Sequence, residues 1–170
     1  MTFDEMVDAR YSVKKFSGQP VEGNKLDRIL KTASKAPTAR NAQAARIYVL
    51  QSEEAVKKAN ELTRCIYGAP VVLLLTYNED EIFHYPESDH HSGDEDCSIV
   101  ATHIMFAAVE EGLGTCWVNF FTPAKAKEIF DLPDNEEPVL LMPIGYAAPG
   151  FKPLPKHTDK RPLEEIVHYL

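Results

Sequence analysis

The hydrophobic positions of the chain follow a helical period in some segments and form unbroken runs in others. Between residues 21 and 37 the recurring apolar positions are Leu26, Ile29, Leu30 and Ala33. Positions i, i+3, i+4 and i+7 lie on one face of a helix, so this segment is predicted to be helical. The segment APVVLLLTYN, residues 69–78, is instead continuously apolar and contains β-branched residues. Such a run is typical of a central strand that is buried on both faces.

The remaining elements follow from the same patterns and from start and stop signals. Thr2 and Glu5 have the spacing of a capping box, which predicts a short helix over residues 3–10. Asp96 is expected to open a long helix that ends at Gly112 and Gly114. Other helices are expected over residues 53–64, 122–133 and 162–170, and other strands over residues 46–52, 115–121 and 138–147. Four strands interleaved with helices indicate one α/β or α+β domain spanning residues 1–170.

Composition and charge narrow the possible functions. Of the 170 residues, 44% are hydrophobic and 26% are charged, which is ordinary for a globular protein and unlike a disordered one. The net charge of -8 argues against nonspecific nucleic-acid binding, which needs a basic surface. No apolar run is long enough to span a membrane, and the acidic N-terminus does not resemble a signal peptide. A cytoplasmic protein with no membrane partner is therefore expected.

Two features of the pattern predict a dimer. The long helix opened by Asp96 is apolar on most sides until Glu110. Residues 148–161 are too rich in proline and polar side chains to pack on the core of their own chain. Each segment therefore needs a further surface to cover it, and a second copy of the chain supplies one.

An alternating basic segment lies near the N-terminus of this acidic chain. Alternate residues of an extended segment point the same way, so Arg10, Ser12 and Lys14 are expected to project together. A guanidinium, a hydroxyl and an ammonium group are suited to hold a phosphate. Taken alone, however, the pattern favours a solvated edge with two surface cations, because short basic motifs are unspecific.

Three further segments are candidates for a binding site. Thr38, Asn41 and Gln43 in APTARNAQAA could hydrogen-bond a flat heteroaromatic ligand, although such residues are also typical of a turn after a helix. The segment EEGLGTCWVNFF does not match the GxGxxG dinucleotide motif, so it is either a core strand or backbone that lies against a ligand ring. Lys160 and Arg161 are either surface charges or additional cations for a phosphate.

The loop of residues 79–95 gathers histidine and acidic side chains, but their spacing matches no zinc or EF-hand pattern. The sequence therefore predicts no specific metal site, with a metal-binding module kept as an alternative. The three cysteines are far apart and are expected to be reduced, with Cys116 in a strand core. His103 is expected to be a hydrogen-bonded helix residue and not a catalyst.

Four segments, taken in order, resemble the nitroreductase family of flavin enzymes. They are ARYSVKKF near the N-terminus, APTARNAQ after the second helix, GLGTCWV after the long helix and KRPLEEIV near the end. Each motif alone is unspecific, but the ordered set spans nearly the whole chain and is similar to short members of the family. The resemblance implies an α+β fold with a central, mostly antiparallel sheet flanked by helices. It also implies a homodimer in which the C-terminal extension wraps the partner, with one FMN per subunit at the dimer interface.

The resemblance also assigns site residues. The FMN phosphate and ribityl chain are expected to contact Arg10, Tyr11, Ser12 and Lys14, with the pyrimidine side of the ring as an alternative contact of Lys14. The loop that reaches the flavin from the other subunit is expected to use Pro37, Thr38, Ala39, Asn41 and Gln43. The residues expected at the reactive N5 side are Trp117, Val118, Asn119 and Phe120. Finally, Lys160 or Arg161 is expected to return to the phosphate.

The activity that the resemblance implies is transfer of reducing equivalents from NAD(P)H through FMN to a small acceptor: a nitroaromatic, a quinone or an activated alkene. No side chain need act as an acid or base, so no catalytic residue is assigned. Many relatives carry glycines where this chain has Asn119 and Phe120, which changes the acceptors that can approach. A non-catalytic flavin-binding or flavin-storage protein on the same fold is the alternative function. The loop of residues 79–95 is either a lid over the flavin or an uninvolved surface excursion.

Overall fold

A computed structural model describes residues 1–170. The helices are α1 (Phe3–Ala9), α2 (Gly23–Ala33), α3 (Glu53–Leu62), α4 (Gly93–Glu110) and α5 (Pro123–Phe130). The strands are β1 (Ala45–Leu50), β2 (Val71–Asn78), β3 (Gly114–Thr115) and β4 (Glu136–Gly145). Short 3-10 turns occur at Ala39–Asn41, Pro155–His157 and Leu163–Glu165. None of the helices has the length and apolar character needed to cross a bilayer.

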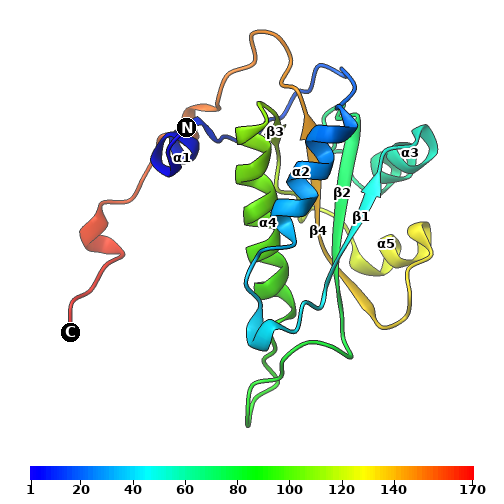
Figure 1. Ribbon diagram of the computed structural model, residues 1–170, viewed down its shortest axis with the longest axis vertical. Coiled ribbons are helices and arrows are strands. Elements are labelled where there is room, and N and C mark those ends of the chain that lie inside the picture. The colour runs from blue at the N-terminus through cyan, green and yellow to red at the C-terminus, as the bar shows by residue number, and fades with distance from the viewer.

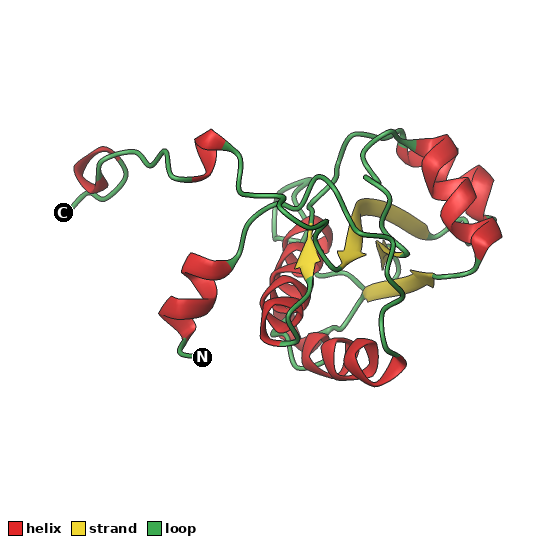
Figure 2. Ribbon diagram, turned by 90° about the horizontal axis from the view of Figure 1, so that it is seen from above, coloured by secondary structure: helices red, strands yellow, loops and turns green.

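The four strands form one sheet in the order β1-β2-β4-β3, and every pair of neighbours is antiparallel. The first seven residues of β2 are buried, so the apolar run at residues 69–78 is confirmed as a central strand. Side chains that alternate along β2 feed two separate cores. Leu73 and Leu75 pack with α2 and α4, whereas Val72 and Leu74 pack with α3 and α5. Figure 2 shows the sheet with helices on both sides. The predicted α+β architecture is confirmed.

Local sequence signals correctly predicted where two helices begin. The capping box is present at the start of α1, where the Thr2 hydroxyl accepts from the Glu5 amide and the Glu5 carboxylate accepts from the Thr2 amide. Thr122 and Pro123 begin α5, although Thr122 makes no side-chain cap hydrogen bond. These signals depend only on residues three or four positions apart, which is why the sequence alone reveals them.

Two predicted boundaries are wrong. The long helix α4 begins at Gly93 and not at Asp96. Ser92 occupies the N-cap position, while the Asp96 side chain is engaged in buried hydrogen bonds within the first turn. The strand predicted over residues 115–121 is reduced to β3 and one isolated bridge between Val118 and Leu141. The ladder stops there because the Asn119 side-chain amide, instead of a backbone amide, donates to the Val139 carbonyl at 2.8 Å.

The helix predicted over residues 162–170 is also wrong, since only a single 3-10 turn forms at Leu163–Glu165. Every residue of the segment is exposed, so its apolar face has nothing to pack against within the chain. A helix this short depends on tertiary packing for its stability. Figure 1 shows the C-terminal tail running away from the sheet, on the same side as α1.

Candidate functional site

The basic segment lies beside the edge of the sheet that β3 forms. Ser12 pairs with Thr115 in a parallel bridge, and the Val13 amide donates to the Thr115 carbonyl at 2.9 Å. The Val13 side chain is buried, at 1% exposure, so its neighbours Ser12 and Lys14 point away from the core. The close approach requires glycine at position 114, because a Cβ there would collide with the Val13 side chain. Burial of Val13 between Ser12 and Lys14 agrees with the predicted alternation, and the common direction of Arg10, Ser12 and Lys14 stays a prediction.

The polar groups of this segment have no partner within the chain. The side chains of Arg10, Ser12 and Lys14 make no hydrogen bond and no ion pair in residues 1–170. Two other cations do have carboxylate partners: Arg28 pairs with Glu111 at 2.6 Å, and Arg46 pairs with Glu81 at 2.7 Å. Free donors from a guanidinium, a hydroxyl and an ammonium group fit a phosphate.

The C-terminal tail passes beside the basic segment. The Tyr11 ring lies 6.3 Å from both the Phe151 ring and the His157 ring, measured between centroids. The Lys160 ammonium donates to the His157 carbonyl at 2.7 Å. Arg161 instead pairs with Glu165 at 3.4 Å and is largely exposed. The tail at Phe151 and His157 therefore lies beside Tyr11 of the basic segment in the same chain.

The tryptophan segment, residues 117–120, continues from β3 along β4. The Trp117 indole N–H donates to the Asn119 side-chain oxygen at 2.6 Å, and these two residues border a cavity of about 520 Å³ together with Tyr77, Asp94 and Glu137. Burial raises the pKa of Tyr77 to about 12, with a further contribution from Asp94. Thr115, which pairs with Ser12, is only two residues before Trp117. The basic segment and the tryptophan segment can therefore contact one elongated ligand.

Phe120 and Val118 differ sharply in their surroundings. Phe120 is 67% exposed, and the Arg64 guanidinium lies 5.6 Å from the centre of its ring. Val118 is buried in the core shared with α3 and α5. Its amide donates to the Leu141 carbonyl and its carbonyl accepts the Leu141 amide, both at 2.9 Å. Val118 therefore acts in packing and in sheet pairing.

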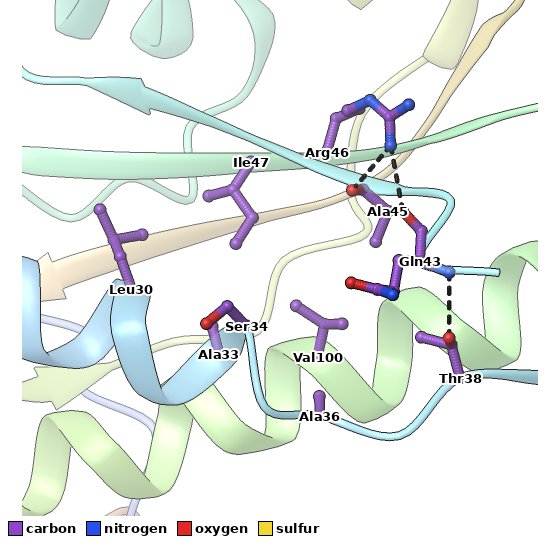
Figure 3. Close-up of a pocket in the computed structure, with 10 residues that line it drawn as sticks. All are labelled: Leu30, Ala33, Ser34, Ala36, Thr38, Gln43, Ala45, Arg46, Ile47 and Val100. Atoms are coloured by element: carbon purple, nitrogen blue, oxygen red, sulfur yellow. Dashed lines mark hydrogen bonds between the residues drawn. The ribbon is translucent and has the colours of Figure 1, made fainter. Parts of the chain in front are cut away.

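The polar loop, residues 37–43, has an unusual backbone. Arg40, Asn41 and Gln43 all have left-handed φ angles between 53° and 55°. The Thr38 hydroxyl accepts from the Gln43 amide at 3.0 Å, a bond drawn in Figure 3. These two residues lie at one end of a mainly apolar groove of about 280 Å³, and Leu30 of α2 lies at the other end. Pro37 and Asn41 are exposed.

The polar loop and the basic segment lie at opposite ends of α4. The Ala39 amide is bonded to Asp96 in the first turn of this helix, whereas Arg10 shares a cavity with Val109 in its last turn. Thirteen residues of helix separate these positions, or about 20 Å at 1.5 Å per residue. Figure 1 shows the same separation, with the turn at Ala39–Asn41 at the bottom of α4 and the N-terminal segment at its top. One chain does not gather all four motifs around one point.

Cys116 and His103, the other candidate side chains, are engaged in packing or hydrogen bonding within the chain. Burial raises the pKa of the Cys116 thiol above its ordinary value, and the side chain is 4% exposed, so it belongs to the core as expected. The His103 ring bonds the Ile99 carbonyl at 2.8 Å, as expected for a hydrogen-bonded helix residue. No group of three or more histidine, cysteine or acidic side chains is arranged to hold a metal ion.

Sequence reasoning missed Asp96 and Ser92 as members of the site region. Both are almost fully buried, at 2% and 0% exposure, and Asp96 contacts the polar loop directly. The sequence pattern predicts Asp96 as a helix start and as one of a group of acidic and histidine residues, because acidic residues are common in a first turn. Its contact with Ala39 joins residues 57 positions apart, and no local pattern records such a contact.

Comparison with known proteins agrees with this geometry. The family model described as Nitroreductase family matches residues 7–66 and 62–146. A nitroreductase family protein from Clostridium difficile 630 is 36% identical, with a TM-score of 0.93 over 99% of this chain and 98% of its own. A Methanothermobacter thermautotrophicus protein, provisionally named NADH dehydrogenase/NAD(P)H nitroreductase, is 26% identical in an alignment 159 residues long that covers 88% of this chain and 81% of that protein. A structure from Exiguobacterium sibiricum 255-15, solved in complex with FMN, is 19% identical over 100% of this chain and 98% of its own, with a TM-score of 0.86.

The family match covers far more than half of the chain and includes the basic segment, the polar loop and the tryptophan segment. The relative from Clostridium difficile extends the likeness to the tail. On this evidence, the protein belongs to the nitroreductase family.

Proposed function

We propose that the protein is an FMN-dependent oxidoreductase that passes reducing equivalents from NAD(P)H to a small acceptor: a nitroaromatic, a quinone or an activated alkene. The observation that carries this proposal is the unpaired set Arg10, Ser12 and Lys14 beside β3, next to the tryptophan segment, in a chain of this family. The relative solved with FMN and the relative named for NAD(P)H support the choice of cofactor and donor.

The residues present fit FMN. Its phosphate is a dianion, which an acidic protein would repel unless local cations compensate for the net charge of -8. Arg10, Ser12 and Lys14 have free donors for it, and the tail adds Lys160 or Arg161. The flat ring would lie against the backbone of Trp117, Val118, Asn119 and Phe120, toward the cavity that Trp117 and Asn119 border.

The separation of the motifs along α4 supports a homodimeric site. The polar loop lies about 20 Å along α4 from the basic segment of its own chain, so the two cannot both contact the phosphate end of one FMN. A second copy, placed with its α4 running in the opposite direction, would bring its polar loop to this site. Pro37, Thr38, Ala39, Asn41 and Gln43 would then contact the ring and ribityl chain from the other subunit.

When bound, FMN supplies the hydride chemistry. The chain's residues would bind and orient it: the cations would neutralise the phosphate, and the backbone of Trp117, Asn119 and Phe120 would lie against the ring. Phe120 is exposed, so it is free to contact the acceptor or the nicotinamide and to limit its size. The Asn119 side chain is fixed by Trp117 and the Val139 carbonyl and is expected to shape the cavity without transferring a proton.

The proposal is tested first by cofactor binding and reduction. We expect purified protein to bind FMN, and Arg10→Ala to weaken this binding about tenfold, the scale of a lost charge-assisted contact. Lys57→Ala, on exposed α3, is the matched control and should leave the affinity unchanged. Anaerobic stopped-flow mixing with NAD(P)H should bleach the bound flavin.

Three results of these experiments would count against parts of the proposal. Absence of FMN binding contradicts the cofactor assignment. A flavin that binds but does not bleach contradicts NAD(P)H as the donor. A flavin that bleaches but shows no turnover with the quinone menadione indicates a flavin-binding protein and not an oxidoreductase.

A further inference from the structure

Asp96 is a buried carboxylate that holds the polar loop from within. It is 2% exposed, and one of its oxygens accepts the Ala39 amide at 2.8 Å. The other oxygen accepts the Ser92 hydroxyl at 2.8 Å. Burying a carboxylate is costly unless hydrogen bonds compensate. Both oxygens of Asp96 are therefore occupied in fixing one backbone position of the loop against the first turn of α4.

Ser92 extends this connection into the lid loop, which we define as residues 79–92. The Ser92 hydroxyl oxygen accepts the Phe83 amide at 3.1 Å, and the Ser92 amide donates to the Phe83 carbonyl at 2.9 Å. The chain of contacts from Ala39 through Asp96 and Ser92 to Phe83 is thus continuous. Because Ser92 is fully buried, water does not compete for these bonds.

Two surface contacts join the same pair of loops. The Arg40 guanidinium lies 5.7 Å from the centre of the Phe83 ring. The Arg46 guanidinium, at the start of β1, donates to the Gln43 carbonyl of the polar loop at 3.1 Å and pairs with both carboxylate oxygens of Glu81 at 2.7 Å. The two loops meet around a shared depression of about 460 Å³ that is lined by Arg40, Ala42, Glu81, Ile82, Phe83 and His84. Buried and exposed contacts therefore act on the same two segments.

The backbone of the polar loop needs such support. Arg40 and Gln43 adopt left-handed conformations that side chains other than glycine, asparagine and aspartate avoid, and Asn41 between them adopts the same conformation at a lower cost. Strained conformations persist only where the surrounding structure enforces them, and they concentrate at ligand contacts. The bond from Ala39 to Asp96 fixes the residue immediately before this strained stretch.

We infer that Asp96 and Ser92 are a positioning pair that holds the polar loop in its ligand-binding shape and couples it to the lid loop. The inference rests on the proposed function for the identity of the ligand, FMN. Neither residue touches the flavin; each acts through Ala39 or Phe83. An acceptor that displaces the lid loop would consequently change how tightly the polar loop binds the cofactor.

Three variants separate the parts of this connection. Asp96→Ala removes both bonds and is expected to raise the Kd for FMN about tenfold or more, as for loss of a hydrogen bond to a charged group. Asp96→Asn keeps an oxygen for the Ala39 amide and an N–H for the Ser92 oxygen, so its Kd should stay within about threefold of wild type. Ser92→Ala leaves the bond from Ala39 to Asp96 and the backbone bond from residue 92 to the Phe83 carbonyl, but it removes the hydroxyl that bonds Asp96 and accepts the Phe83 amide.

Hydrogen exchange measured without FMN tests the coupling independently of the ligand. In Asp96→Ala, amides of both loops should exchange faster than in wild type. In Ser92→Ala, the Phe83 amide should lose protection while the Ala39 amide keeps it. If wild type does not bind FMN, the proposed function fails, and these exchange rates still decide whether the pair couples the loops.

Glu136→Gln is the matched control for general loss of stability. Glu136 is likewise a buried carboxylate, 7% exposed, and accepts the Thr76 hydroxyl at 2.6 Å and the Tyr48 hydroxyl at 2.7 Å, but it contacts neither loop. This variant should leave the Kd for FMN unchanged. The inference is overturned if Glu136→Gln weakens FMN as much as Asp96→Ala does. It is also overturned if Asp96→Ala leaves both the Kd and the exchange of the polar loop at wild-type values.

Discussion

Gly114 decides how closely the basic segment can approach the sheet. A side chain at this position would collide with the Val13 side chain, which anchors the basic segment in the core. Ser12 and Lys14 flank Val13, so any shift of Val13 moves the groups proposed to bind phosphate. Gly114, which has no side chain to bind a ligand, therefore controls the position of Ser12 and Lys14.

Gly114→Ala is expected to lower the free energy of unfolding by about 1–3 kcal/mol, the usual cost of overpacking, and to weaken FMN binding. Denaturant titration and FMN titration measure the two effects. Gly23→Ala is the control, because a Cβ on Gly23 meets nothing within 4 Å.

A double-mutant cycle tests whether the collision with Val13 causes the loss of stability in Gly114→Ala. Replacing Val13 by alanine should cost less in the Gly114→Ala background than in wild type, because it relieves the collision. Costs that simply add would show that the two side chains do not clash.

At the scale of elements, helices and strands formed where local patterns predicted them, provided that they had a surface to pack on. The run in β2 became a central strand, since both of its faces are covered by helices. The last segment has comparable periodicity, with Leu163, Ile166, Val167 and Leu170 on one face, yet it forms a single 3-10 turn. Periodicity describes which face would be buried, whereas burial itself requires a partner surface.

The lid loop carries a pH-sensitive contact at its junction with α4. The Tyr85 hydroxyl donates to Glu95 at 2.7 Å, and the His90 ring lies 3.0 Å from its other oxygen. The Tyr85 hydrogen bond, followed by that of His90, holds the pKa of Glu95 below its ordinary value of 4.5. A carboxyl whose pKa falls on folding stabilises the folded state above its unfolded pKa. That contribution disappears as the pH falls through the lower, folded-state value.

Glu95→Gln should therefore lower the Tm slightly at neutral pH, and the difference from wild type should shrink and vanish as the pH falls below 4.5. Thermal unfolding of both proteins across this pH range checks the expectation. Tyr85→Phe, which removes the main donor, should reproduce most of the effect. A difference that is independent of pH would exclude ionised Glu95 as its source.

At the scale of the whole molecule, the tail and the separated motifs point to assembly. The last 20 residues expose Leu154, Leu163, Ile166, Val167, Tyr169 and Leu170 to solvent. Exposed apolar side chains that are concentrated in one segment mark an interaction surface. The same tail carries Lys160 past Tyr11, so the proposed dimer contact and the proposed phosphate contact share one segment.

Removing residues 152–170 should convert a dimer into a monomer, or weaken its association about tenfold or more, and should abolish tight FMN binding. Light scattering after size exclusion and FMN titration measure the two outcomes. In the full-length chain, the double replacement Lys160→Ala and Arg161→Ala should weaken FMN binding but keep the dimer. A truncated protein that remains dimeric with unchanged FMN affinity would contradict both roles of the tail.

The sequence by itself determined the elements with local causes and the family to which they belong. The capping box of Thr2 and Glu5, the run in β2 and the alternation around Val13 depend on residues a few positions apart, so their patterns are visible without coordinates. Only the tertiary structure placed the polar loop and the basic segment at opposite ends of α4, and only it revealed Asp96 beneath Ala39. Those facts depend on contacts between residues far apart in the chain, which no local pattern encodes.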